Sequence, residues 1–281
     1  MKILVTGANG QLGKCIKDAS KNFPDFELYF ASREELDIEN DDFVAEIFTK
    51  NDFDYCINTA AYTNVEKAES EQEKAFSINA EAVKNLAKCC KDTNTVLIQL
   101  STDYVFDGNK GTPYTEEDPT NPINVYGASK LKGEKYVQEI CKKYFILRTS
   151  WLYSQYGHNF YNSMLRFAKE GKDLKITTEQ TGTPTNANDL ALALLKIIQS
   201  KSNNYGIYHF SNSGEATWYD FAKEILTQTK QLSQTNLAKT DHYPTFAARP
   251  EFSVLGTKKY KNNFKSNLVA WKSSLNEIKK R

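Results

Sequence analysis

The sequence predicts an α/β protein in which helices cover both faces of a doubly wound parallel sheet. Short apolar strands alternate with longer amphipathic segments through the first half of the chain. A glycine-rich turn joins the first of these strands to the first amphipathic segment. Consecutive strands that are separated by helical segments pair in parallel, because the helix returns the chain to the edge where the previous strand began.

The first half of the chain contains the elements of this sheet. Five strands are expected from short apolar runs at residues 2–6, 26–31, 54–60, 95–101 and 145–149. Four helices are expected from amphipathic segments at residues 11–22, 41–50, 71–91 and 126–143. We therefore predict one sheet domain over residues 1–150.

The pattern becomes less regular after residue 151. Helices are expected at residues 160–169, 188–199 and 219–229, and strands are expected at residues 174–178 and 206–211. Two short helical patterns follow Arg249 and Pro250. We predict that residues 151–281 form a smaller region beside the sheet, with some segments returning to it. The cleft between the two parts, at the carboxyl ends of the strands, is where such sheets bind ligands.

Composition excludes several classes of protein. The 281 residues are 40% hydrophobic with a mean hydropathy of −0.59, which suits a buried core but not a membrane protein. Lys and Arg number 36 against 35 Asp and Glu, so no net field attracts nucleic acid or an acidic membrane. The five cysteines form no C-x-x-C pair, which argues against a disulfide framework or a zinc site. The chain opens directly on a strand without a secretion segment, so we expect a cytoplasmic protein.

The turn after the first strand predicts a dinucleotide site. Gly7, Gly10 and Gly13 lie between the strand and the following helix. Glycines at this spacing allow a tight turn, a close backbone approach to a pyrophosphate and close contact between helix and strand. The helix start also offers free N–H groups and a positive dipole end. We therefore expect a Rossmann-type fold, although a glycine-rich turn without a ligand is the structural alternative.

The end of the second strand bears on which dinucleotide binds. Ser32 and Arg33 stand where an arginine accommodates the 2′-phosphate of NADP, and Asp37 stands within reach of the adenine. This pattern favours NADPH and leaves NADH possible. The alternative is that Arg33 is an exposed residue that starts the next turn.

Three residues form a candidate catalytic group. Thr102 ends the fourth strand, and Tyr126 and Lys130 are four residues apart, so they share one face of a helix. Gly133, with Val137, Ile140 and Tyr144 beyond it, continues that face, so we expect it to point toward the interior.

The chemistry of these side chains explains their spacing. A free tyrosine has a pKa of about 10 and transfers protons poorly near neutrality. We expect the Lys130 ammonium and the positive charge of an oxidised nicotinamide to lower the pKa of Tyr126. In the reducing direction Tyr126 gives its proton to a carbonyl oxygen, and Thr102 donates a hydrogen bond to the same oxygen. A Y-x-x-x-K pattern alone is more often a solvated helix face, but here it accompanies the glycine turn.

At this point the sequence resembles the dTDP-4-dehydrorhamnose reductases, a family of extended short-chain dehydrogenases. The resemblance spans nearly the whole chain, and STDYVFDG at residues 101–108 is its most specific motif. The matching segments are TGANGQLG (6–13), NTAAYTNVEKAE (58–69), STDYVFDG (101–108), PINVYGASK (122–130), RTSWLY (148–153), NF (159–160), QTGTPT (180–185), ARP (248–250) and SVL (253–255). It implies reduction of the 4-keto group of dTDP-4-dehydro-β-L-rhamnose to dTDP-β-L-rhamnose.

The resemblance also implies roles for individual residues. It assigns Thr102, Tyr126 and Lys130 to the reaction, with Tyr126 and Lys130 also at the cofactor. The remaining cofactor residues that we expect are Gly7, Gly10, Gln11, Leu12, Gly13, Ser32, Arg33, Asp37, Ile38, Ala60, Ala61, Tyr62 and Thr63. The expected substrate-binding residues are Thr102, Asp103, Trp151, Asn159 and Arg249.

Two of the expected substrate contacts have structural alternatives. The Trp151 indole can form an apolar wall for a sugar or base, or it can be a core side chain at the junction of the two regions. The Arg249 guanidinium can grip a pyrophosphate through forked hydrogen bonds, or it can be a surface residue before a proline.

Other functions and partners remain open. Some members of the family bind magnesium at a dimer contact, but we cannot assign its ligands here, so magnesium and the choice between monomer and homodimer stay undecided. His158, His209 and His242 lack the spacing of a metal cluster. Dehydratases of this fold place an Asp–Glu pair after the catalytic threonine, whereas Asp103 precedes Tyr104. A different nucleotide-sugar reductase, an epimerase and a non-catalytic NADP-binding regulatory subunit are the alternatives.

Overall fold

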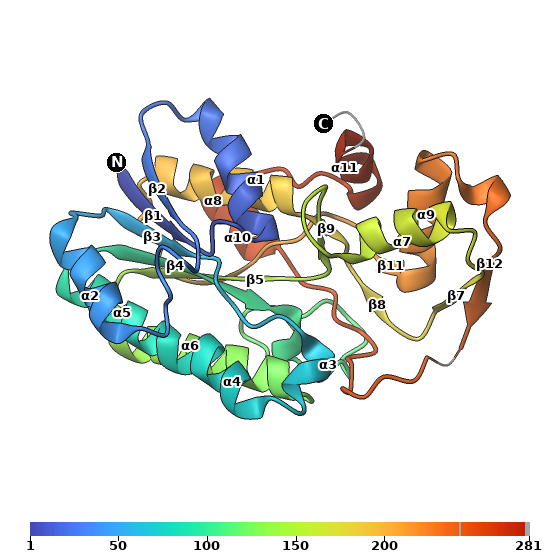
Figure 1. Cartoon of the computed structure of the whole chain (residues 1–281), viewed down its shortest axis with the longest axis horizontal. Coiled ribbons are helices and arrows are strands. Elements are labelled where there is room, and N and C mark those ends of the chain that lie inside the picture. The colour runs from blue at the N-terminus through green and yellow to red at the C-terminus, as the bar shows by residue number, and fades with distance from the viewer. Residues whose placement is uncertain (242, 279–281) are drawn as a thin grey trace.

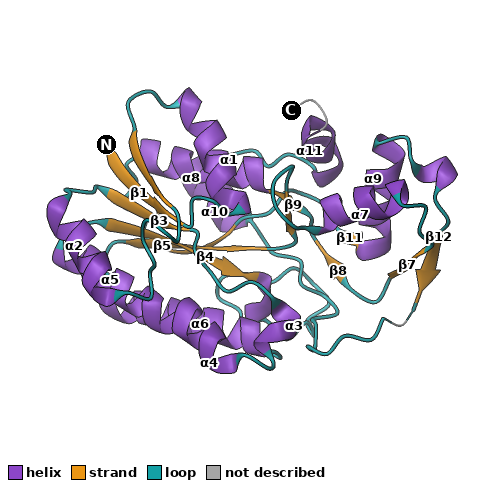
Figure 2. Ribbon diagram, viewed as in Figure 1, coloured by secondary structure: helices purple, strands orange, loops and turns teal. Residues whose placement is uncertain are grey.

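A six-stranded parallel sheet lies at the centre of the computed structural model, which describes residues 1–241 and 243–278 (Figures 1 and 2). The strand order is β10-β5-β4-β3-β1-β2. The strands are β1 (Lys2–Thr6), β2 (Glu27–Ala31), β3 (Tyr55–Asn58), β4 (Val96–Thr102), β5 (Tyr144–Thr149) and β10 (Gly206–His209). The order reverses at β1, which pairs with β2 on one side and β3 on the other, and this confirms the doubly wound sheet.

Helices cover both faces of the sheet, as Figure 1 shows. On one face lie α1 (Gln11–Ala19), α8 (Ala187–Gln199) and α10 (Lys258–Phe264). On the other lie α2 (Asp41–Lys50), α5 (Ala82–Asp92) and α6 (Val125–Ile140). Three elements that follow residue 151 therefore belong to the sheet or to the helices that cover it: α8, α10 and β10.

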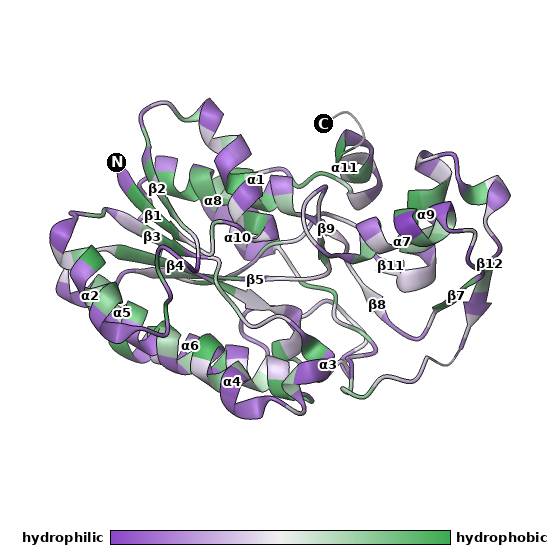
Figure 3. Cartoon of the chain, in the orientation of Figure 1, coloured by the Kyte–Doolittle hydropathy of each residue, from purple (hydrophilic) through white to green (hydrophobic). Residues whose placement is uncertain are grey.

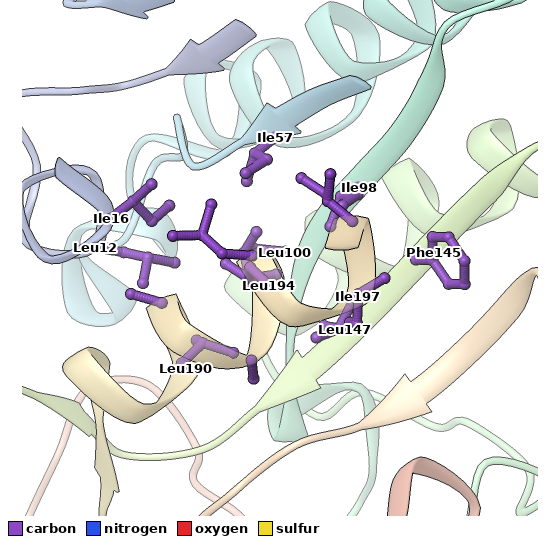
Figure 4. Close-up of a cluster of buried hydrophobic side chains, with 14 of the residues drawn as sticks. Leu12, Ile16, Ile57, Ile98, Leu100, Phe145, Leu147, Leu190, Leu194 and Ile197 are labelled. Atoms are coloured by element: carbon purple, nitrogen blue, oxygen red, sulfur yellow. The ribbon is translucent and has the colours of Figure 1, made fainter. Parts of the chain in front are cut away.

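The main core lies between the sheet and the α1–α8 pair (Figure 4). Every residue of β4 is buried, as expected for a central parallel strand with a helix layer on each face. Figure 4 shows this core with the side chains of Leu12, Ile16, Ile57, Ile98, Leu100, Phe145, Leu147, Leu190, Leu194 and Ile197 labelled. Leu12 and Ile16 therefore fix α1, and the glycine turn before it, against the carboxyl-end half of the sheet.

A second, smaller core lies in the region beyond the sheet. It is built from α7 (Phe160–Lys169), α9 (Trp218–Gln228) and α11 (Trp271–Ile278). Three short strand pairs belong to the chain after residue 151: β6 (Leu152–Tyr153) with β9 (Thr185–Asn186), β8 (Thr181–Gly182) with β11 (Ala216–Thr217), and β7 (Leu174–Thr177) with β12 (Leu237–Thr240). Figure 3 shows hydrophobic residues on β7 and α9, beside hydrophilic ones at the surface of this region. Among the described residues, no helix is long and apolar enough to cross a membrane.

Several elements differ from the sequence prediction in their limits. The single helix expected at residues 71–91 is divided into α4 (Gln72–Phe76), a π-helical turn η2 (Ser77–Glu81) and α5. The helix expected at residues 126–143 ends at Ile140, and Tyr144 lies on β5, so Tyr144 does not continue the face of Tyr126. Elements that the sequence did not predict are α3 (Val65–Ala68), β6, β8, β9, β11, β12 and the 3-10 turns η1 (Ser20–Asn22), η3 (Asp103–Val105) and η4 (Leu232–Gln234).

Candidate active site

At two positions in the turn between β1 and α1, glycine is the only residue that fits. Gly7 has a φ of 65°, and a Cβ there would lie 2.7 Å from the backbone nitrogen of Ala60. A Cβ at Gly13 would lie 2.6 Å from the carbonyl oxygen of Ala8, so α1 packs directly on the turn. A cavity of about 220 Å³ opens beside this turn, and Gly10, where a Cβ would lie 3.1 Å from the carbonyl oxygen of Gly7, is part of its lining. This cradle fits a pyrophosphate that approaches the backbone closely.

The same cavity brings together residues from three loops. Its described lining contains Gly7, Asn9, Gly10, Arg33, Leu36, Asp37, Ile38, Glu39, Thr59, Ala60, Ala61 and Ile78. Seven of the expected cofactor residues therefore lie on it. Ser32 is buried nearby, and its backbone N–H donates to Glu35 Oε2 at 2.8 Å instead.

Arg33 lies at the exposed rim of this cavity between two carboxylates. Its Nε donates to Asp37 Oδ2 at 3.2 Å, and its Nη2 donates to Glu39 Oε2 at 3.1 Å. The arginine side chain is 66% exposed, so these ion pairs are weak and leave the guanidinium able to turn toward another anion. The exposed position agrees with the structural alternative, and contact with a 2′-phosphate stays a prediction.

Thr102, Tyr126 and Lys130 meet at the carboxyl end of β4. Asn124 caps α6 by accepting a hydrogen bond from the backbone N–H of Gly127 at 2.7 Å. A Cβ at Gly127 would overlap the carbonyl oxygen of Tyr104, so only glycine lets the first turn of α6 approach this closely. The Tyr126 ring packs edge-on against the Tyr104 ring with 5.9 Å between centroids. These contacts place the Tyr126 phenol beside Thr102, close enough for the threonine hydroxyl to act on the acidity of the phenol.

Burial controls the acidity of this group. Burial raises the pKa of Tyr126 to about 12, although the Thr102 hydroxyl acts in the opposite direction. Burial also lowers the pKa of Lys130 to about 8, and its Nζ donates to the carbonyl oxygen of Leu100 at 2.6 Å. Desolvation is the largest effect on Tyr126 here, and the expected lowering of its pKa by Lys130 together with a nicotinamide charge stays a prediction. A raised pKa keeps the phenol protonated near neutrality, which is the form a proton donor requires.

Asn79 is a site residue that the sequence analysis missed. It lies in the π-helical turn η2 and is 1% exposed. Its Nδ2 donates to the carbonyl oxygen of Tyr62 at 3.0 Å and to Ser129 Oγ at 3.0 Å, and its Oδ1 accepts from the Tyr62 N–H at 2.9 Å. Ser129 in turn donates to the carbonyl oxygen of Tyr126 at 2.8 Å. The expected cofactor loop at residues 60–63 is thus bonded to the helix that carries Tyr126.

Asp103 is buried next to Thr102. It is 2% exposed, and its Oδ1 accepts a hydrogen bond from Thr102 Oγ1 at 3.0 Å. Burial raises the pKa of Asp103 from its ordinary 3.8 to about 7. The folded protein therefore holds this proton more tightly than the unfolded chain does.

This difference predicts a pH-dependent stability. We expect the free energy of unfolding of the wild type, measured relative to Asp103→Asn, to fall as the pH rises from 3.8 to about 7. The physical reason is that ionising a buried carboxyl costs solvation energy only in the folded state. Urea unfolding of both proteins at a series of pH values checks this, and a constant difference between the two would contradict it.

A larger cavity of about 580 Å³ lies in the smaller region. Its described lining is His158, Asn159, Phe160, Ser163, Met164, Phe167, Lys172, Asp173, Leu174, Lys175, Ile176, Thr177, Gln180, Trp218, Tyr243 and Arg249. Two expected substrate residues, Asn159 and Arg249, lie on it. Trp218 is a lining residue that the sequence analysis missed.

Trp151 does not belong to this lining. Its ring stacks on the Trp218 ring at 3.6 Å between centroids with an angle of 8° between planes. Its φ is 45°, and a Cβ at Gly182 would lie 2.6 Å from the indole ring. Trp151 therefore supports the cavity wall that Trp218 provides, as a junction residue would.

Arg249 is held by a carboxylate far away in the sequence. Its Nη2 donates to Glu66 Oε1 at 2.6 Å, and the guanidinium side chain is 25% exposed. Glu66 Oε2 also accepts from the backbone N–H groups of Phe246 at 2.8 Å and Ala247 at 3.1 Å. Glu66 therefore fixes the segment that brings Arg249 to the cavity.

A buried ion pair lies behind the catalytic helix. Arg148 on β5 and Glu134 on α6 are 2% and 1% exposed, and Arg148 Nη2 donates to Glu134 Oε2 at 2.6 Å. Arg148 Nε also lies 2.9 Å from Glu134 Oε1, which makes the contact forked. The neighbouring His209 is fully buried, and burial lowers its pKa to about 3, so its imidazole is neutral. His158 lines the larger cavity, and His242 lies outside the described residues.

No group of three or more His, Cys, Asp or Glu side chains in the described part of the chain has the geometry of a metal site.

Known proteins resemble this chain over nearly its whole length. A family model described as the RmlD substrate binding domain matches residues 1–281. The dTDP-4-dehydrorhamnose reductase of Sinorhizobium fredii is 39% identical over 287 residues, covering 99% of this chain and 96% of that protein.

Solved structures give the same result. The dTDP-4-dehydrorhamnose reductase of Bacillus anthracis in complex with NADP superposes with a TM-score of 0.94 at 36% identity, covering 99% of this chain and 98% of the other. The orthologue from Clostridium acetobutylicum has a TM-score of 0.94 at 40% identity, covering 100% and 99% of the two chains. The similarity therefore extends over both the sheet layer and the smaller region.

Proposed function

Because this chain belongs to the family of dTDP-4-dehydrorhamnose reductases, we propose that Thr102, Tyr126 and Lys130 carry out that family's reaction with NADPH. The protein is an NAD(P)H-dependent oxidoreductase that reduces the 4-keto group of dTDP-4-dehydro-β-L-rhamnose to dTDP-β-L-rhamnose. The observation that supports the proposed roles is that Tyr126 lies beside Thr102 at the end of β4, while Lys130, one turn further along α6, donates to the carbonyl oxygen of Leu100 on the same strand.

The chain's own residues would perform the proton transfer. A bound NADPH supplies the hydride. Tyr126 donates its phenolic proton to the carbonyl oxygen. The Thr102 hydroxyl, which donates to Asp103 Oδ1 in the structure, would turn to stabilise the developing charge on that oxygen with a second hydrogen bond. Lys130, one helical turn away, stabilises the phenolate that remains on Tyr126. Burial keeps water from competing for these hydrogen bonds.

A spectroscopic assay tests the proposed reaction. We expect purified protein, NADPH and dTDP-4-dehydro-β-L-rhamnose to lose nicotinamide absorbance in proportion to the sugar added. An epimerase would return the hydride and leave the absorbance unchanged, and a regulatory subunit would bind NADPH without turnover. Either of these results would refute the reductase assignment.

Arg33 supports the preference for NADPH. Its guanidinium lies at the rim of the dinucleotide cavity, where it can exchange its exposed carboxylate partners for a 2′-phosphate. Because a hydrogen bond to a charged group contributes about 1.5–3 kcal/mol, we expect Arg33→Ala to raise the KM for NADPH roughly tenfold. The KM for NADH should change by less than about twofold, since NADH has no phosphate at this position.

Steady-state kinetics with each dinucleotide check this prediction. Glu34→Ala is a matched control, because Glu34 is the exposed neighbour of Arg33 and does not line the described cavity. An equal rise in the KM for NADPH and for NADH in the Arg33 variant would show that Arg33 does not recognise the 2′-phosphate.

The proposal includes a cytoplasmic location and a monomer or homodimer without nucleic-acid or membrane partners. The balanced charge of 36 basic and 35 acidic side chains supports the absence of a polyanionic partner. Light scattering at several protein concentrations would determine the oligomeric state. Assays with and without a chelator would decide whether magnesium is needed.

A further inference from the structure

The loop before α7 is bonded along one face of α1. Tyr156 Oη donates to Asp18 Oδ2 at 2.7 Å, and the Lys14 ammonium lies over the Tyr156 ring at 5.8 Å. Asn159 Nδ2 donates to Gln11 Oε1 at 2.6 Å. Gln11, Lys14 and Asp18 are three and four residues apart, so they form a single stripe on the helix. The smaller region is therefore held to the helix that follows the glycine turn by side-chain contacts.

The orientation of the Asn159 amide is fixed by its other partners. Besides Gln11, its Nδ2 donates to the carbonyl oxygens of Ser154 at 2.9 Å and Tyr156 at 3.0 Å. Its Oδ1 accepts from the backbone N–H of Asn162 at 3.0 Å, as the N-cap of α7. Carbonyl oxygens only accept hydrogen bonds, so the atom of Asn159 that faces them must be nitrogen. Every hydrogen-bonding atom of the Asn159 side chain is thus occupied by protein.

This fixed amide determines which way Gln11 faces. Because Asn159 presents N–H to it, Gln11 must present its carbonyl oxygen in return. The two N–H groups of Gln11 Nε2 therefore point elsewhere, and they donate to no residue that the structure describes. Gln11 is the first residue of α1, directly after Gly10, where the helix dipole and free N–H groups favour an anion.

We propose that Asn159 is a positioning residue for the dinucleotide, which orients Gln11 so that its amide N–H groups face the pyrophosphate. This inference rests on the proposed dinucleotide site and replaces the expected role of Asn159 in contacting the sugar nucleotide. A Gln11 amide turned the other way would present its oxygen to the phosphates and repel them. The same segment supplies His158, Asn159 and Phe160 to the lining of the larger cavity.

Binding measurements on two single variants and their combination test the proposal. Asn159→Ser keeps an oxygen that can cap α7 but removes the amide that orients Gln11. Gln11→Met removes the Gln11 amide and keeps a side chain of similar length. We expect each change to raise the NADPH dissociation constant about tenfold, measured by nicotinamide fluorescence, and the double variant to bind no more weakly than the weaker single variant.

Asn162→Ala is the matched control. Asn162 Nδ2 donates to the carbonyl oxygens of Gly157 at 2.9 Å and Ser154 at 3.3 Å in the same loop, but no contact joins it to Gln11. We expect this variant to bind NADPH within about twofold of the wild type. Unchanged binding in Asn159→Ser, multiplied effects in the double variant, or an equal loss in Asn162→Ala would each overturn the proposal. The titration uses no sugar, so its outcome is independent of whether the protein reduces dTDP-4-dehydro-β-L-rhamnose.

Discussion

Tyr126→Phe is expected to lower turnover at least about 100-fold while leaving the NADPH dissociation constant nearly unchanged. The variant keeps the ring that packs against Tyr104 but has no proton to give to the carbonyl oxygen. Burial raises the pKa of the wild-type phenol to about 12, so the proton is present throughout the neutral range. Single-turnover reduction of the keto-sugar at saturating NADPH measures this effect directly.

Tyr104→Phe is the matched control for this prediction. Tyr104 is the neighbouring buried tyrosine, and its ring centroid lies 5.9 Å from that of Tyr126. Burial also raises the pKa of Tyr104, but this residue is not part of the proposed proton transfer. We expect Tyr104→Phe to keep turnover within about threefold of the wild type. Near-normal turnover in Tyr126→Phe, or equal losses in both variants, would remove Tyr126 from the mechanism.

Arg148→Met is expected to lower the free energy of unfolding by about 3–5 kcal/mol. The change leaves Glu134 buried at 1% exposure without the guanidinium that holds both of its carboxylate oxygens. The neighbouring His209 is a poor replacement, because burial, the largest cause that lowers the pKa of its imidazole, remains in the variant. Urea unfolding at pH 7, followed by circular dichroism, measures the loss.

The double variant Glu134→Leu with Arg148→Met separates the charge from the packing. Both charges are then absent, so we expect most of the lost stability to return. If the double variant were as unstable as Arg148→Met alone, the instability would come from altered packing around Phe106, over which the arginine lies at 5.2 Å. That result would contradict an electrostatic origin.

The fold was predictable because local patterns and the tertiary structure agree. The strand Lys2–Thr6 and the helices Asp41–Lys50 and Phe160–Lys169 have the limits expected from the sequence. In each, the apolar period matches the face that packs on a core, and Asn40 and Asn159 cap the two helices. The doubly wound sheet followed from the alternation of these elements and is confirmed.

Other features depend on contacts that a linear pattern does not contain. A π-helical turn divides the helix that was expected at residues 71–91, and it places Asn79 against the Tyr62 backbone. This interruption serves the site and is not required by the helix itself. Strand β12 pairs with β7 more than 60 residues earlier, which no local signal indicates. The assignments of individual site residues stay predictions until the variants are measured.

The raised pKa of Tyr126 comes from burial, which the sequence pattern does not show. The spacing of Tyr126 and Lys130 was correctly read as one helical face, and it suggested an acidic phenol. The depth of burial, which sets the larger effect, depends on β4 and the Tyr104 ring and is not visible in the spacing. Long-range partners of this kind also explain why the Glu66 contact with Arg249 was not foreseen.

Two glycines of α6 have a consequence for redesigning this protein. Gly127 packs against the Tyr104 carbonyl, and a Cβ at Gly133 would overlap the carbonyl oxygen of Asn79. Directed evolution toward other sugars should therefore recover almost no tolerated changes at these two positions. Acceptable diversity should accumulate instead around Trp218 and Lys172, which line the larger cavity and can alter its shape without displacing the proton donor.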